Sequence, residues 1–190
     1  QLSESVFTEP YQPPTTDGPE GLRRNLKTAL DLLRSAGYEI REGKMVKAGT
    51  GEPLAFEILL FQKTFERVVL PFKNNLARLG IDMTVRTVDS NQYVQRLRNF
   101  DFDMIVQTLG QSDSPGNEQR DYWYSSSADM HGSRNYMGVR DPVVDQLVDL
   151  VIQAPDRQEL VYRVRALDRV LLHGYYAIPQ WHLGKDRGAY

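Results

Sequence analysis

The residues best suited to ligand chemistry lie in one polar loop, residues 109–117, which reads LGQSDSPGN. It follows the apolar run 104–106, which is typical of a buried strand, and open α/β sheets bind ligands at the carboxyl ends of their strands. The Asp113 carboxylate can pair with an amino group, while Gly110 and Gly116 let a ligand approach the backbone closely. The pattern predicts a ligand-binding loop. The alternative is an ordinary surface loop, in which Asp and Ser support turns.

Recognisable catalytic motifs are absent from the sequence. There is no G-x-S-x-G turn for a serine nucleophile and no glycine-rich loop of the kinds that bind phosphates. The chain has no cysteine, which excludes disulfides, thiol catalysis and cysteine-ligated metals. We therefore expect ligand binding without catalysis and without a cofactor. The alternative from the enzyme class is a hydrolase-like domain that uses Ser112 or Ser133, and it requires an imidazole close to the hydroxyl.

The histidines and the paired acids do not form a metal motif either. The three histidines, which share no spacing typical of metal ligands, are His131, His173 and His182. His173 falls at a predicted helix end, where an imidazole interacts favourably with the terminal carbonyls. Asp101 and Asp103 alternate as at the start of a strand, with no further carboxylate at EF-hand spacing. We expect no metal site.

Composition and charge narrow the class of protein. Of the 190 residues, 41% are hydrophobic and 25% charged, as in ordinary globular domains. The formal net charge of −2 argues against a nucleic-acid partner, because such proteins are usually basic. No uninterrupted apolar run reaches about 18 residues, so we expect no membrane span. Gln1 is not an initiator methionine and the chain stops at Tyr190 without a cap or linker, so we expect an excised piece of a longer mature protein.

The first 110 residues predict alternating helices and strands. Four prolines within residues 1–21 predict an irregular, partly extended lead-in. Hydrophobic spacing then predicts the following elements: a helix over 22–36, a hairpin-like pair of arms at 45–46 and 54–61, a helix over 65–79, a strand over 81–86, a helix capped by Asp89 and a deeply buried strand from Met104. This order is typical of an α/β fold with a mixed sheet and flanking helices.

The remaining residues begin with a long segment without periodicity, 110–138, in which we expect one helical turn around 120–126. A loop of this length in a compact domain is usually functional. Two helices are predicted after it, one capped by Asp141 and one by Asp156, each followed by an apolar stripe. The segment 176–183 predicts a final strand.

Short motifs of modest individual weight are distinctive in their order and spacing. They are Pro10-Tyr11, Ala36-Gly37-Tyr38, Leu79-Gly80-Ile81-Asp82, Val88-Asp89 with Tyr93, Phe102-Asp103, Asn135-Tyr136-Met137-Gly138 and Asp141-Pro142-Val143-Val144-Asp145. Over nearly the whole chain, they resemble family-five extracellular solute-binding proteins, the receptors of ABC importers for dipeptides, oligopeptides and nickel. A second group resembles the microcin C-type and long-peptide subgroup: Ser114-Pro115-Gly116-Asn117-Glu118, Gly132-Ser133-Arg134-Asn135 and Ile178-Pro179-Gln180-Trp181-His182.

The resemblance implies a lobe of the type II periplasmic-binding-protein kind. Such receptors are larger than this chain and close two lobes on a ligand, so residues 1–190 are expected to be a single carboxyl-terminal ligand-binding lobe. A periplasmic location and a membrane permease as partner are implied as well. In peptide-binding relatives an aspartate after the strand that follows Phe-Asp pairs with the α-amino group of the ligand, and Asp113 is the nearest equivalent. Ahead of it relatives often carry a tryptophan and a small residue, where this chain has LGQS at 109–112.

We therefore predict the following ligand-binding residues: Leu109, Gly110, Gln111, Asp113, Arg134, Asn135 and Trp181. The backbone near the loop would bind the main chain of a peptide, as in strand addition, and Asp113 would neutralise an amino terminus. Arg134 and Asn135 would add polar contacts, while Trp181 would pack against a ligand side chain or, alternatively, within a core or interface. A sensory ligand-binding domain of a regulator remains a further alternative.

Overall fold

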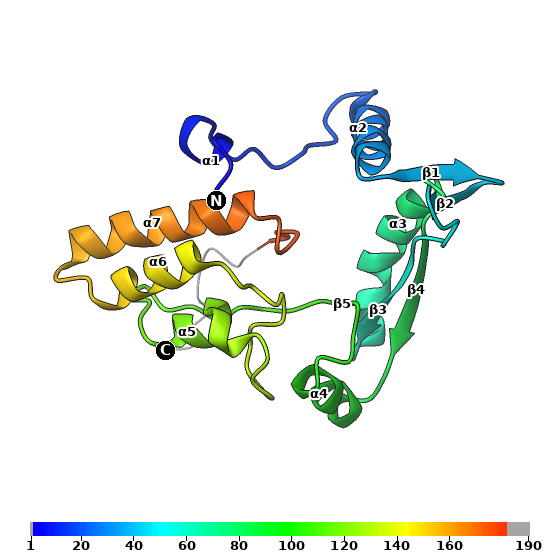
Figure 1. Cartoon of the computed structure of the whole chain (residues 1–190). Helices are drawn as coiled ribbons and strands as arrows, with labels where there is room; N and C mark the ends of the chain where they lie inside the picture. Colours follow the sequence, from blue (N-terminus) through cyan, green and yellow to red (C-terminus); the bar gives the residue numbers. More distant parts are fainter. Residues whose placement is uncertain (1, 182–190) are drawn as a thin grey trace, which may run out of the picture. The chain divides into compact units, whose positions relative to one another are not determined.

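The structure, a computed structural model, describes residues 2–181 of the chain, which form two compact units (Figure 1). Unit 1 combines Gln1–Tyr11 with Gln111–Tyr190, and unit 2 is the continuous segment Gln12–Gly110. Buried hydrophobic clusters lie within each unit. That residues 1–190 make up a single lobe stays a prediction. In the described part of the chain, no helix combines the length and the apolar character needed to cross a membrane.

Unit 2 carries the α/β part of the fold, with one parallel sheet and one antiparallel hairpin. Strands β1 and β2 pair antiparallel, and the second sheet has the strand order β4-β3-β5 with parallel pairing throughout. The expected α/β class with flanking helices is confirmed. Its elements are α2 (Gly21–Ser35), β1 (Tyr38–Arg41), β2 (Lys44–Lys47), β3 (Ala55–Leu60), η1 (Lys63–Phe65), α3 (Glu66–Ala77), β4 (Asp82–Thr87), α4 (Ser90–Arg98) and β5 (Met104–Ile105).

The parallel sheet is held by α3 on one face and by an acidic side chain at one end. Val69 of α3 packs against Ile58 of β3 and Met83 of β4, and all three are buried. At the start of β5 the Asp103 carboxylate accepts a hydrogen bond from the backbone N–H of Glu57 at 2.9 Å. This side chain therefore continues the β3–β5 pairing beyond the strand, which gives the Phe-Asp motif a structural role.

One predicted strand assignment in unit 2 is wrong and another is incomplete. The arms 45–46 and 54–61 meet at their near ends as predicted, because Val46 and Pro53 form an antiparallel bridge and Leu54 N donates to the Met45 carbonyl at 2.8 Å. The prediction missed β1, which also pairs with β2, through a turn whose residues Glu42 and Gly43 both have positive φ, as two-residue hairpin turns favour. The strand predicted from Met104 spans only two half-buried residues. Where its ladder stops, the Val106 carbonyl accepts a hydrogen bond from the Tyr93 hydroxyl at 3.0 Å. The most deeply buried strand is β3 instead.

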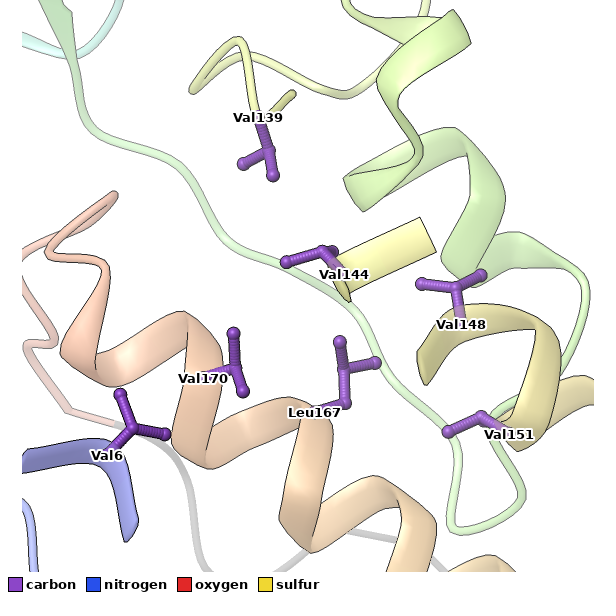
Figure 2. Close-up of a cluster of buried hydrophobic side chains, with 7 residues drawn as sticks. All are labelled: Val6, Val139, Val144, Val148, Val151, Leu167 and Val170. Atoms are coloured by element: carbon purple, nitrogen blue, oxygen red, sulfur yellow. The ribbon is translucent and has the colours of Figure 1, made fainter. Parts of the chain in front are cut away.

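Unit 1 is helical in its described residues. Asp141 and Asp156 cap α6 and α7 by accepting hydrogen bonds from Val143 N and Glu159 N, so both predicted helix starts are confirmed. Its elements are α1 (Ser5–Thr8), α5 (Glu118–Trp123), η2 (Ser125–Ser127), α6 (Pro142–Ile152) and α7 (Arg157–His173). The aliphatic core gathers side chains of α1, α6, α7 and the segment before α6 (Figure 2): Val6, Val139, Val144, Val148, Val151, Leu167 and Val170.

Two further expectations for unit 1 need correction. The lead-in 1–21 is not irregular throughout, because α1 forms in it and buries Val6 against α7. The Arg169 guanidinium donates to the carbonyls of Val6 and Glu9, which holds α1 in place. The strand predicted over 176–183 is absent from residues 176–181, while 182–183 lie outside the described residues.

Candidate functional site

The predicted ligand loop is tied to the helix that follows it by a single carboxylate oxygen. Glu118, the first residue of α5, accepts hydrogen bonds at Oε1 from Gly116 N at 2.8 Å, Gln111 Nε2 at 3.0 Å and Gln119 Nε2 at 3.3 Å. These donors come from both ends of the loop and from the helix itself. One atom therefore holds both ends of the loop against α5.

Gln119 connects this arrangement to the core of unit 1. It is only 5% exposed, and its amide donates to Gln111 Oε1 at 2.5 Å and accepts from Trp123 Nε1 at 3.1 Å. Trp123 packs against the aliphatic core described above. Hydrogen bonds thus run from the packed core to the loop, so the shape of the loop depends on the position of α5.

The donors around Glu118 lower the pKa of its carboxyl from 4.5 to about 2. The largest cause is the hydrogen bond from Gln111, followed by an opposing effect of desolvation and then by backbone N–H donors, with Gly116 first among them. Hydrogen bonds of this kind favour the charged form of an acid. The carboxylate stays ionised, and its acceptor sites stay available to the loop, at any ordinary pH.

This lowered pKa predicts an acid-dependent loss of stability. Because the folded pKa lies below the unfolded value, the stabilisation is complete above about pH 5 and is lost as the pH falls toward 2. We expect about 1–2 kcal/mol, reduced by solvent screening. Urea unfolding at pH 6 and pH 3 should show a larger decrease in the wild type than in Glu118→Gln. Equal decreases in the two proteins would contradict the prediction.

Asp113 lies between the anchored ends of the loop and presents its carboxylate to solvent. Ser114 N donates to Ser112 Oγ at 3.2 Å, which closes a turn around Asp113, and Arg157 of α7 donates to the Asp113 carbonyl. The backbone on either side is therefore bonded. Within residues 2–181 the Asp113 carboxylate itself makes neither a hydrogen bond nor an ion pair, and the residue is exposed.

The neighbouring predicted residues differ in their surroundings. Leu109 and Gly110 are the last residues of unit 2 and both are exposed, with Leu109 at 39% of its full accessibility. Gln111 is exposed but uses its amide on Glu118 and Gln119. Gln111 and Asp113 therefore lie in one hydrogen-bonded loop of unit 1. The Gln111 amide supports the shape of the loop, whereas the Asp113 carboxylate faces solvent.

Arg134 belongs to a separate cluster on α5. Its Nε donates to Asp121 Oδ2 at 2.5 Å and its Nη1 to the Tyr122 hydroxyl at 2.7 Å, with the guanidinium carbon 4.2 Å from the centre of the Tyr122 ring. The Asp121 hydrogen bond raises the pKa of Arg134. The charge of Arg134 is thus largely engaged within unit 1.

Asn135 is fully buried and its amide is completely used by the backbone. Nδ2 donates to the carbonyls of Tyr124 and Val139 at 3.1 and 3.0 Å, and Oδ1 accepts from Val139 N at 2.8 Å. These bonds explain the Asn-x-x-Gly motif as a structural device, because they fix the turn ahead of α6. A ligand contact of Arg134 or Asn135 stays a prediction, and neither is hydrogen bonded to the loop in the described residues. Trp181 follows α7 and is 63% exposed.

The residues considered for catalysis or metal binding have ordinary structural surroundings. Ser133, 3% exposed, donates its hydroxyl to the Ser127 carbonyl at 2.6 Å. His173 bonds through Nδ1 to the Arg169 carbonyl at 2.9 Å, in the helix-end role that its position indicates. Asp101 pairs with Arg96 at 2.9 Å. In the part of the chain that the structure describes, no three His, Cys, Asp or Glu side chains gather to hold a metal.

Sequence reasoning identified the loop but missed the residues that hold it. The sequence presents Glu118 only as the last residue of the motif SPGNE, and Gln119 belongs to no motif. The available signal was an acid in the first turn of a short helix, two residues after a glycine. Such an acid usually stabilises its own helix, and only the folded loop places Gly116 N and Gln111 against it.

Comparison with known proteins places this chain among solute-binding proteins. Residues 3–131 match the sequence profile of the bacterial extracellular solute-binding proteins, family 5 Middle. The probable peptide-binding protein YejA of Agrobacterium fabrum is 46% identical over 190 residues, which are 100% of this chain and 31% of that protein. The chain therefore spans less than a third of the length of this curated relative.

Two solved structures share its fold. AppA of Bacillus subtilis, in complex with a nonapeptide, matches with a TM-score of 0.69 and 22% identity over 79% of this chain and 30% of AppA. The periplasmic oligopeptide-binding protein of Thermotoga maritima, bound to mannohexaose, matches with a TM-score of 0.73 and 21% identity over 84% of this chain and 31% of that protein. At this identity the likeness establishes the fold, that of periplasmic binding proteins of the oligopeptide-binding type.

Proposed function

Because this chain belongs to the bacterial extracellular solute-binding proteins of family 5, we propose that it supplies one lobe of the substrate-binding component of an ABC importer. The receptor binds an oligopeptide or peptide-like solute between two lobes and leaves its bonds intact. Residues 1–190 contribute the carboxyl-terminal lobe, the receptor works in the periplasm, and a membrane permease receives the ligand. The narrower relation to the microcin C-type and long-peptide subgroup is part of this proposal.

The observation that carries the proposal is the presentation of Asp113. Its carboxylate is exposed and unpaired within residues 2–181, while the backbone around it is held by Ser112 and Arg157. An unpaired anion on a supported loop suits a ligand ammonium group, such as the amino terminus of a peptide. Closure of a second lobe over this pair would remove water and strengthen the attraction.

The remaining predicted residues complete the proposed site. We propose main-chain contacts of an extended peptide at the exposed residues Leu109 and Gly110, and contact of a ligand side chain with the exposed Trp181 ring. The peptide class is supported by the name of the YejA relative and by the sign of the Asp113 charge. The fold alone does not decide it, because the Thermotoga structure holds mannohexaose.

We expect Asp113→Asn in the complete two-lobe receptor to weaken peptide binding by about 10- to 100-fold, since charged hydrogen bonds contribute about 1.5–3 kcal/mol. Calorimetry with a random heptapeptide pool bearing free amino termini measures the effect. The same pool with acetylated termini should bind the wild type and the variant equally weakly. Asp168→Asn, an exposed acid of α7, is the matched control. Equal binding of the free and acetylated pools by the wild type would rule out Asp113 as the anchor.

A further inference from the structure

We propose that Glu118 is a positioning residue that sets ligand affinity by shaping the loop that presents Asp113, without touching the ligand itself. The inference rests on the proposed function of Asp113. Glu118 and Asp113 have opposite roles although both are acids. The Glu118 carboxylate accepts hydrogen bonds within the protein from Gly116 N and Gln111 Nε2. The Asp113 carboxylate, in contrast, accepts no hydrogen bond from the described residues.

The first argument is the convergence of three donors on one oxygen. Backbone and side-chain N–H groups from Gln111, Gly116 and Gln119 all reach Oε1 of Glu118. Without that oxygen, these donors would face one another with no shared acceptor. The loop would then lose the only atom that joins both of its ends among the described hydrogen bonds.

The second argument is the position of Asp113 between the anchored points. Gln111 lies two residues before Asp113 and Gly116 lies three residues after it, so the Glu118 bonds limit the paths that the intervening backbone can take. Arg157 holds the Asp113 carbonyl from α7, but a single bond leaves the loop free to rotate about it. A loop released from Glu118 must be ordered when the ligand binds, and that ordering weakens affinity.

The third argument concerns what different substitutions leave behind. Gln at position 118 keeps one acceptor oxygen but loses the negative charge, and hydrogen bonds to a neutral acceptor are weaker than those to a charged one. Leu keeps neither. If Glu118 acts through the loop, the effects on affinity follow that order. If Glu118 only stabilised the short helix α5, its replacement would not selectively weaken the binding of the ligand's ammonium group.

The test uses the complete two-lobe receptor and the heptapeptide pool with free amino termini. We expect Glu118→Leu to lower affinity by about tenfold or more and Glu118→Gln by about two- to fivefold. Glu159→Leu is the matched control, because Glu159 is also an acid in the first turn of a helix in unit 1 and pairs with Arg163 at 3.2 Å. The control should change affinity less than twofold.

A double-mutant cycle separates positioning from general stability. In the Asp113→Asn background, Glu118→Leu should add less than a twofold further loss, because the group that it positions has lost its charge. Full additivity would overturn the inference. Hydrogen–deuterium exchange of residues 111–118 without ligand should accelerate at least tenfold in Glu118→Leu, and unchanged exchange would also overturn it. If the wild type binds no peptide, the proposed function fails, and the exchange experiment alone decides whether Glu118 shapes the loop.

Discussion

Replacing Asn135 by leucine is expected to lower the free energy of unfolding by about 2–5 kcal/mol, because it leaves both backbone polar groups of the buried Val139 without a partner. The Asn135 amide hydrogen bonds to both polar groups of Val139. Its bond to the Tyr124 carbonyl is less critical, because Ser127 N and Ser127 Oγ also donate to that oxygen. Val139 is itself fully buried in the core of unit 1, so water cannot replace the lost partners. Leucine has a similar volume but offers no donor or acceptor.

Urea unfolding followed by circular dichroism measures this loss. Asn117→Ala provides the control, because Asn117 is exposed and makes no side-chain cap bond at the start of α5. The control should change stability by less than about 0.5 kcal/mol. A loss below about 1 kcal/mol in Asn135→Leu would mean that the turn before α6 can rearrange to satisfy its own backbone.

Replacing Gly80 by alanine is expected to destabilise unit 2 by about 3 kcal/mol. The backbone strain of alanine at a positive φ adds to the steric overlap of its Cβ with neighbouring backbone atoms. Gly80 has a φ of +78°, and a Cβ there would lie 2.7 Å from Met45 N and 2.8 Å from the Gly43 carbonyl oxygen. Both neighbours are backbone atoms and cannot swing aside. Met45 N also donates to the Gly80 carbonyl at 2.8 Å, so a shift of either segment breaks that bond.

Gly37→Ala separates the two causes. Gly37 has a φ of +86°, but a Cβ there would meet no atom within 4 Å, so alanine adds strain without overlap and should cost about 1 kcal/mol. Thermal unfolding of the two variants compares them directly. Equal losses of stability in Gly37→Ala and Gly80→Ala would show that the close approach of the β1–β2 hairpin to Gly80 does not add to the cost of the Gly80 substitution.

The parts of the fold that were predicted from sequence are those in which cause and effect lie within a few residues. The caps Asp89, Asp141 and Asp156 each bond an N–H two or three positions later, so the local sequence specifies the helix start. Strand pairing has no such local signal. The length of β5 depends on the backbone groups that the distant strand β3 offers, and it was predicted wrongly. The predicted pairing of residues 45–46 with the arm from 54 is present, but β1 as a second partner was missed.

In the candidate site, too, the features set by local sequence were predicted and those set by folding contacts were not. The exposure of the loop around Asp113 follows from its polar, glycine-containing sequence and agrees with the structure. The supporting roles of Glu118 and Gln119 depend on how the loop folds back on α5, which no spacing rule specifies. The hydrogen bonds of Arg134 to Tyr122 and of Asn135 to Val139 were likewise not predicted from the sequence, and a ligand contact of either residue stays a prediction.

The contact of α1 with α7 has a consequence for biosynthesis. Val6 and Arg169 lie 163 positions apart, so the segment that fills one side of the unit 1 core leaves the ribosome long before the helix that receives it. Unit 2, being continuous, has all of its residues available by the time Gly110 emerges. We expect unit 2 to mature first on the nascent chain, while the leading segment waits for α7 with its apolar side chain unprotected.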